Sequence, residues 1–219
     1  MPIATFRPTV LSVALIAAVA ACGSSTPSNT GSAPDMADNG LVASTIANNG
    51  YVTSGAWHGY AFTYQSTNSG TISPACPTPC FSGAGAYLCA SGSLNVDPTF
   101  GAVAELGIHL NQDSTDPGGS GATVATTGTG LTVNVHVKSG AANARVQVQD
   151  DKSNRWCALL PANGQGTIPW TSFNSKCWDG SGTAYAVGTP ISQAAIVVPS
   201  DGAAARPFDF CLVSIAPAP

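Results

Sequence analysis

Hydrophobic and polar residues alternate along two neighbouring segments near the middle of the chain. Residues 131–138 place Leu or Val at every odd position and Thr, Asn, His or Lys at every even one, and residues 145–149 place two valines between Arg145, Gln147 and Gln149. A period of two puts successive side chains on opposite faces, so each segment is predicted to be a strand with one apolar and one polar face. The connection through 139–143 contains a glycine, and we expect it to join the strands as an antiparallel hairpin.

The same reasoning predicts further strands along the chain. In 103–110 we expect Leu106, Ile108 and Leu110 to face inward and the residues between them to face outward. Other strand segments are expected at 57–64, 87–96, 156–160, 166–170, 184–187, 191–198 and 208–215, and loops at 72–85 and 111–119. About ten short antiparallel strands, separated by loops rich in Gly, Pro and Asn, predict an all-β jelly-roll β-sandwich.

The first 40 residues differ in composition from the rest of the chain. An apolar run from Val10 to Ala21 leads through small residues into Cys22. The sequence Val19-Ala20-Ala21-Cys22 resembles the bacterial lipobox, which implies cleavage before Cys22 and lipidation of that cysteine; an ordinary signal peptide is the alternative. We therefore expect a lipoprotein signal peptide over 1–21, a flexible Ser/Gly/Pro tether over 22–40 and a single domain over 41–219. Such a protein would be exported and anchored to a membrane of the bacterial cell envelope or surface.

The remaining cysteines are even in number, which favours disulfide bonds in an exported chain. They are Cys76, Cys80, Cys89, Cys157, Cys177 and Cys211. We expect Cys157 to pair with Cys177, because that bridge closes a loop of about 20 residues and restricts the unfolded chain by roughly 3 kcal/mol. Cys76 is expected to pair with Cys80 or Cys89, which leaves one partner for Cys211. Zinc binding at 76–80 is the alternative, which two prolines and the absence of a second close pair disfavour.

Charged residues make up only 8% of the chain, against about a quarter in ordinary globular proteins. The surface is therefore expected to consist of Ser, Thr, Asn, Gln and Gly. With 7 Lys and Arg against 11 Asp and Glu the net charge is −4, and no basic stripe offers contacts to phosphates. Nucleic acid is not an expected partner, and we expect a monomer.

Five segments follow the order found in a known class of binding module. They are Tyr-Leu-Cys-Ala-Ser-Gly at 87–92, Ala-Glu-Leu-Gly-Ile-His-Leu-Asn at 104–111, Ala-Arg-Val-Gln-Val at 144–148, Thr-Ile-Pro-Trp-Thr-Ser-Phe at 167–173 and Pro-Phe-Asp-Phe-Cys-Leu at 207–212. In order and spacing, the stretch from Tyr87 to Ile215 resembles the jelly-roll, galactose-binding-like carbohydrate-binding modules of bacteria. The resemblance implies binding of a polysaccharide or oligosaccharide. Val213 and Ser214 stand where such modules often carry paired aspartates, which leaves their structural calcium open; no other cofactor is expected.

Proteins bind sugars through planar hydrogen-bonding side chains and aromatic faces, in clefts that are largely preformed. The polar face of the expected hairpin offers such groups, and the strand at 103–110 would add two more if it lies alongside. The candidate ligand-binding residues are Asn134, His136, Arg145, Gln147, Gln149, Glu105, His109 and Trp156. Further aromatic candidates are Trp57, Tyr60, Tyr64, Tyr87 and Trp178, whereas Trp170 is expected in the core. The alternative is a solvated sheet face that merely lacks Lys and Glu.

Catalysis is not expected. Glu105 is the only glutamate, whereas a glycosidase normally needs two carboxyl groups flanking the bond. No Gly-x-Ser-x-Gly motif occurs, and the three histidines are too scattered for a recognisable triad. A metal at Glu105, His109 and His136 would require their strands to pair, and Asp113 and Asp116 lack the spacing of a calcium loop. The sequence thus predicts non-catalytic carbohydrate binding, and the alternative is a structural or adhesive surface lipoprotein that binds protein.

Overall fold

The computed structural model describes residues 44–47, 49–75, 81, 87–140 and 143–219. This part of the chain is all-β, as predicted, and forms a β-sandwich with fourteen strands and one short 3-10 helix, η1 (Trp170–Ser172). In the described ranges no helix has the length and apolar character needed to cross a membrane. The expected signal peptide, the tether and the cysteines at 22, 76 and 80 lie outside the described residues.

The larger sheet contains seven strands, and every neighbouring pair is antiparallel. Their spatial order is β1 (Thr45–Ile46), β2 (Tyr51–Ser54), β3 (Trp57–Gln65), β6 (Val103–His109), β13 (Gln193–Pro199), β9 (Arg145–Gln149) and β10 (Arg155–Leu159). The four strands β3, β6, β13 and β9 form its centre. We call this seven-stranded sheet the large sheet.

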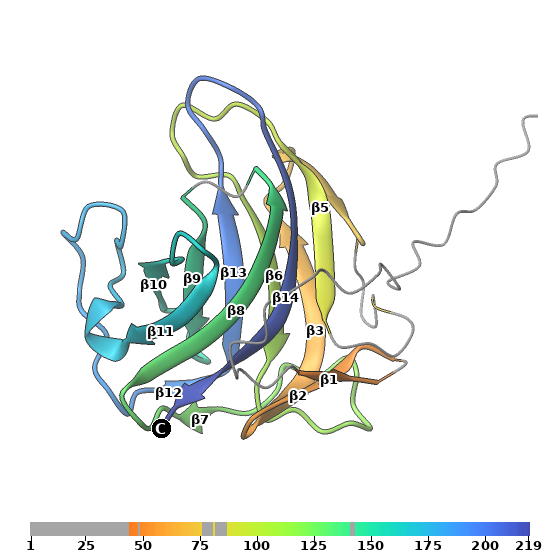
Figure 1. Cartoon of the computed structure of the whole chain (residues 1–219), viewed down its shortest axis with the longest axis vertical. Coiled ribbons are helices and arrows are strands. Elements are labelled where there is room, and N and C mark those ends of the chain that lie inside the picture. The colour runs from red at the N-terminus through yellow and green to blue at the C-terminus, as the bar shows by residue number, and fades with distance from the viewer. Residues whose placement is uncertain (1–43, 48, 76–80, 82–86, 141–142) are drawn as a thin grey trace, which may run out of the picture.

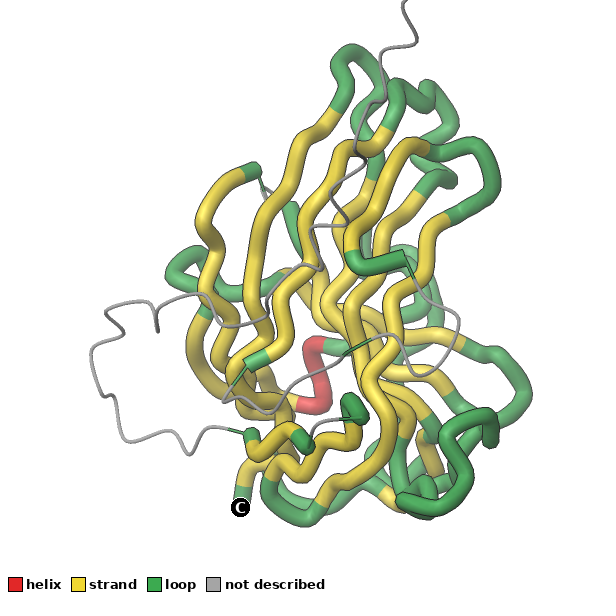
Figure 2. Tube along the Cα trace, turned by 90° about the vertical axis from the view of Figure 1, so that its right-hand side faces the viewer, coloured by secondary structure: helices red, strands yellow, loops and turns green. Residues whose placement is uncertain are grey.

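The smaller sheet contains five antiparallel strands and covers one face of the large sheet (Figure 1). Their spatial order is β11 (Gln165–Pro169), β8 (Gly130–Ser139), β14 (Arg206–Ala218), β5 (Leu88–Leu94) and β4 (Gly70–Ser73). A separate pair is formed by β7 (Val124–Ala125) and β12 (Pro190–Ile191). The chain passes repeatedly from one sheet to the other, as it does in a jelly roll. Figure 2 shows that the strands run along the sandwich and that most loops gather at its two ends.

One hydrophobic core lies between the two sheets, built from the inward residues of alternating strands. Leu106 and Ile108 of β6 are fully buried there, as the sequence predicts, and so are Val146 and Val148 of β9. Trp170 is also in the core, and its indole Nε1 donates a hydrogen bond to the Thr127 carbonyl oxygen at 3.1 Å. A buried indole N–H needs such a partner. The outward residues of the same strands are therefore fixed on the opposite face.

The predicted hairpin between 131–138 and 145–149 is wrong. β8 pairs with β11 and β14 in the small sheet, whereas β9 pairs with β10 and β13 in the large sheet. Alternation shows which side chains point inward, but both sheets of a sandwich bury one face in the same way. The apolar faces of β8 and β9 thus face the core from opposite sides. Their polar faces point away from each other.

Two disulfide bonds lie within the described residues. Cys157 pairs with Cys177, which confirms the prediction, and Cys211 pairs with Cys89 on the neighbouring strand, with their Cα atoms 4.0 Å apart. Two local predictions are wrong. Residues 70–73 form strand β4, which reaches into the expected loop at 72–85. Residues 184–187 form no strand, because Tyr185 is buried against the aromatic rings beside η1.

Candidate functional site

The outward side chains of five neighbouring strands of the large sheet align in three rows, which we call the outer face. The register places Tyr64, Glu105, Val197, Arg145 and Leu159 in the first row. The second row holds Phe62, Gly107, Ala195, Gln147 and Cys157, and the third holds His109, Gln193, Gln149 and Arg155. Polar groups from β6, β9, β10 and β13 therefore share one surface.

Five of the eight candidate ligand-binding residues lie on the outer face. They are Arg145, Gln147, Gln149, Glu105 and His109. The strand at 103–110 does contribute to the face, but β13 lies between it and β9. β13 adds Gln193, which the sequence analysis missed although it begins a run whose residues at 193, 195 and 197 share one face.

The structure separates the other three candidates from this face. Asn134 and His136 lie on β8 in the small sheet, and within the described residues the buried Oδ1 and Nδ1 atoms of these side chains have no hydrogen-bond partner. The strand pairing that would bring His136 together with Glu105 and His109 is therefore not formed. Trp156 points into the core between Arg155 and Cys157, and its ring packs edge-on against Tyr185 at 5.3 Å between centroids.

A contact between Arg155 and Glu105 shows that the outer face is concave. The Arg155 Nη1 atom lies 3.4 Å from Glu105 Oε1, and Arg155 Nε donates to Gln149 Oε1 at 2.7 Å. β9 and β13 lie between the strands of Arg155 and Glu105, so in a flat sheet their Cα atoms would be roughly 19 Å apart. That distance exceeds the combined length of the two side chains. The strands must curl toward each other, with Gly107 and Ala195 at the base of the trough.

Glu105 is the acidic group of the outer face, and it is only 4% exposed. Burial raises the pKa of its carboxyl group, while the positive charge of Arg155 and a hydrogen bond from Gln147 act in the opposite direction. The ion pair to the half-exposed Arg155 contributes little stability, because water screens it. Its effect is geometric: Glu105 orients Gln147 and Arg155, whose remaining N–H donors are available to a ligand.

His109 closes the third row of the outer face as a partly buried imidazole. Burial lowers its pKa, against the opposing effect of a backbone hydrogen bond with Ser120, so the ring is neutral at pH 7. Its Nδ1 atom lies 3.4 Å from Gln193 Nε2, and Phe62 packs on it at 4.8 Å between centroids. These contacts make His109 a support for the Gln193 amide.

Aromatic side chains flank the trough at both edges. Trp178 is 55% exposed, and the Arg145 guanidinium carbon lies 4.9 Å from its ring centroid, within the range of a cation–π contact. The adjacent Cys157–Cys177 bond ties the Trp178 segment to β10. Tyr64 lies at the opposite edge, on β3, and is also exposed. Trp178, rather than Trp156, is thus the tryptophan at the outer face.

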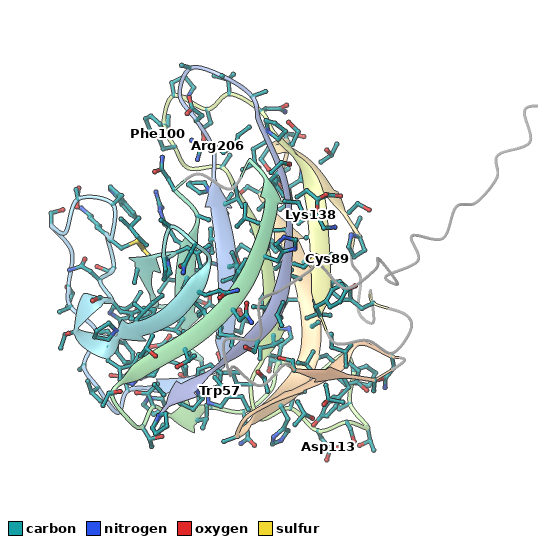
Figure 3. All side chains as sticks on the ribbon, in the orientation of Figure 1. Trp57, Cys89, Phe100, Asp113, Lys138 and Arg206 are labelled. Atoms are coloured by element: carbon teal, nitrogen blue, oxygen red, sulfur yellow. A yellow bond between two sulfur atoms is a disulfide. The ribbon has the colours of Figure 1, made fainter. Side chains whose placement is uncertain are left out.

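The described residues contain no group of three His, Cys, Asp or Glu side chains arranged to hold a metal ion. Asp113 in the 111–119 loop accepts hydrogen bonds from the backbone N–H and the hydroxyl of Thr115, at 2.8 Å each. These bonds form a local turn and lower the pKa of Asp113. Figure 3 shows Asp113 at the end of the sandwich where Trp57 lies, opposite the end that carries Phe100 and Arg206.

The outer face therefore combines planar amides and guanidinium groups, a single carboxyl group and a base of small side chains. Groups of this kind exchange hydrogen bonds with hydroxyl groups. The sequence matches no protein-family model, and no curated protein matches it. The function must be argued from this geometry.

Proposed function

We propose that the outer face binds a polysaccharide or oligosaccharide without cleaving it. The observation that carries the proposal is the chain of side-chain contacts linking Gln149, Arg155, Glu105 and Gln147 across the concave sheet. It holds amide and guanidinium groups in fixed positions before a ligand arrives. Preorganised polar groups lose little conformational entropy on binding, which favours recognition of a weakly held, hydrated ligand such as a sugar.

The base and the edges of the trough support the same class of ligand. Gly107 cannot be enlarged, because a Cβ atom there would lie 2.6 Å from the Ala194 carbonyl oxygen and 2.7 Å from Ala195 Cβ. Exposed rings at the edges offer flat surfaces for the apolar side of a pyranose. In this proposal the protein is anchored at Cys22 to a membrane of the bacterial cell envelope and holds its glycan there.

The test is retention of the oxidised full chain on a panel of soluble and insoluble polysaccharides, with and without chelator. Gln147→Ala is expected to reduce retention at least tenfold, because it removes one side chain that hydrogen-bonds to the ligand. Thr132→Ala is the matched control: it removes a side-chain hydrogen bond, the 3.0 Å contact to Thr167, from the outer side of the small sheet and should leave retention unchanged. Absence of retention on every glycan would favour the alternative, a structural or adhesive lipoprotein that binds protein.

A further inference from the structure

A pocket of about 560 Å³ opens at one end of the outer face, where β13 leaves the large sheet. Its lining includes Phe100, Arg145, Leu159, Trp178, Ser200 and Arg206. Arg145, Leu159 and Trp178 belong to the edge of the trough, whereas Phe100 and Ser200 come from loops and Arg206 is the first residue of β14. Figure 3 shows Phe100 and Arg206 together at this end of the sandwich. A ligand lying along the trough would reach the pocket.

The pocket contains one guanidinium group that has no ion-pair partner among the described residues. Arg206 forms an ion pair with Asp201, at 3.0 Å between Nη2 and Oδ2, and also donates to the Pro199 carbonyl oxygen at 3.1 Å. Arg145 forms no ion pair with any described residue. Its pKa is lowered, mainly by burial and further by the charge of Arg206, which lines the same pocket. A negative group bound between them would relieve this repulsion.

Two buried polar atoms of the pocket lack hydrogen-bond partners within the described residues. They are Nε of Arg145 and Oγ of Ser200, which account for two of the four such atoms found in that part of the chain. Buried polar groups in folded proteins are nearly always paired, and an exception needs an explanation. Both atoms belong to residues that line the same pocket.

Exposed rings flank these groups. Phe100 is 59% exposed, and its backbone has φ +56°, a left-handed conformation that is unusual for a bulky residue. Asp97 holds this turn by accepting hydrogen bonds from the N–H groups of Gly101 and Ala102, at 2.9 and 2.8 Å. The Trp178 ring lies against the Arg145 guanidinium group, 4.9 Å from its central carbon to the ring centroid. A planar cation between exposed rings matches a ligand that has both an apolar ring face and a negative group.

We propose that this pocket binds the carboxylate of an acidic sugar residue, so that the glycan held by the outer face contains uronic acid. The inference rests on the proposed function, because the pocket continues the trough. A carboxylate suits the site better than a neutral hydroxyl group, since a guanidinium group donates two parallel hydrogen bonds to it.

The test compares each acidic polysaccharide with its carboxyl-reduced form, in which the acid has become an alcohol and the backbone is unchanged. The oxidised full chain is applied to alginate, polygalacturonate and glucuronoxylan in both forms, and to cellulose and xylan. For the polymer that the protein retains, we expect the native form to bind about tenfold more tightly than the reduced form. Equal binding to both forms, or retention on neutral polymers alone, would overturn the acidic subsite and leave the proposed function standing. No retention on any polymer would overturn both.

Variants separate the pocket from general electrostatics. Arg145→Gln should remove most of the tenfold preference for the native polymer over its reduced form. Lys138→Gln removes one positive charge at an exposed ion pair with Asp209 and should leave this preference unchanged. Arg145→Lys should restore only part of the preference, because an ammonium group lacks the planar pair of donors. If Arg145→Gln does not fold, Phe100→Ala, which truncates an exposed ring, replaces it; unchanged affinity for the native polymer would then count against the pocket.

Discussion

The two disulfide bonds are expected to differ in what they contribute, because one supports the outer face and the other does not. The perturbation is a pair of double variants, Cys157→Ala with Cys177→Ala, and Cys89→Ala with Cys211→Ala. The bonded residues are 20 and 122 positions apart in the sequence. Loop closure in the unfolded chain then gives stabilisations of about 3 and about 5 kcal/mol. Removing the second bond should therefore destabilise the protein more.

Ligand binding should follow the opposite order. Cys157 lies in the second row of the outer face, beside Gln147, and Cys177 precedes Trp178, which covers Arg145. Without this bond the Trp178 segment is tied to β10 only further back, by the backbone hydrogen bonds between Cys157 and Asn174, so Trp178 is no longer fixed at the trough edge and the pocket. The Cys89–Cys211 bond joins β5 and β14 in the small sheet. Its removal leaves the outer face in place as long as the protein is folded.

The assay combines urea denaturation with a separate measurement of retention on the glycan, made in buffer without urea at low temperature. With a slope of about 1–3 kcal/mol per molar urea, a loss of 3 kcal/mol moves the midpoint by at least about 1 M, and a loss of 5 kcal/mol moves it further. Retention should fall severalfold for the first variant and stay unchanged for the second. Normal retention by the first variant, or lost retention by a folded second variant, would refute the reasoning.

Two further predictions concern pH and anchoring. Burial raises the folded-state pKa of Glu105 above its ordinary value of 4.5, so the folded state keeps a proton that the unfolded chain releases. The stability that this proton contributes to the folded state is fully present below pH 4.5 and is lost as pH rises through the folded-state pKa. As pH rises above 4.5, the melting temperature of Glu105→Gln should therefore fall less than that of the wild type. Parallel curves of melting temperature against pH for the two proteins would contradict the burial argument. Cys22→Ser should move the protein from the membrane to the soluble fraction of expressing cells, whereas identical fractionation of both proteins would argue against lipidation.

The alternation of the sequence was sufficient to predict strands and the direction of their side chains. Leu106 and Ile108 point inward as predicted, and Glu105 and His109 point outward beside the residues of β9. Strand partners could not be obtained in the same way. Every strand of a sandwich buries one face, so the pattern of β8 is compatible with either sheet. Asn134 was therefore placed on the same face as Arg145, although the two strands face each other across the core.

The tryptophans illustrate the same limit at the level of single residues. Trp156 and Trp178 each adjoin a cysteine of one disulfide bond, and the sequence does not distinguish between them. The register does, because Arg155 and Cys157 pair with outward residues of β9 and Trp156 must then point inward. Gln193 was missed for a related reason. β13 is a central strand whose outward residues Ala195 and Val197 are also apolar, so its two faces look alike in the sequence.

The distribution of satisfied and unsatisfied groups assigns different roles to the trough and the pocket. In the trough, Glu105, Gln149 and Arg155 already hydrogen-bond to one another, so a ligand there mostly exchanges one partner for another at a small net gain. In the pocket, the buried Arg145 Nε has no partner to give up among the described residues. A ligand carboxylate that pairs with the Arg145 guanidinium group would gain charge-assisted hydrogen bonds without breaking an ion pair between described residues, which is the larger effect. Discrimination between glycans should therefore depend on the pocket, while the trough supplies contacts that many sugars can satisfy.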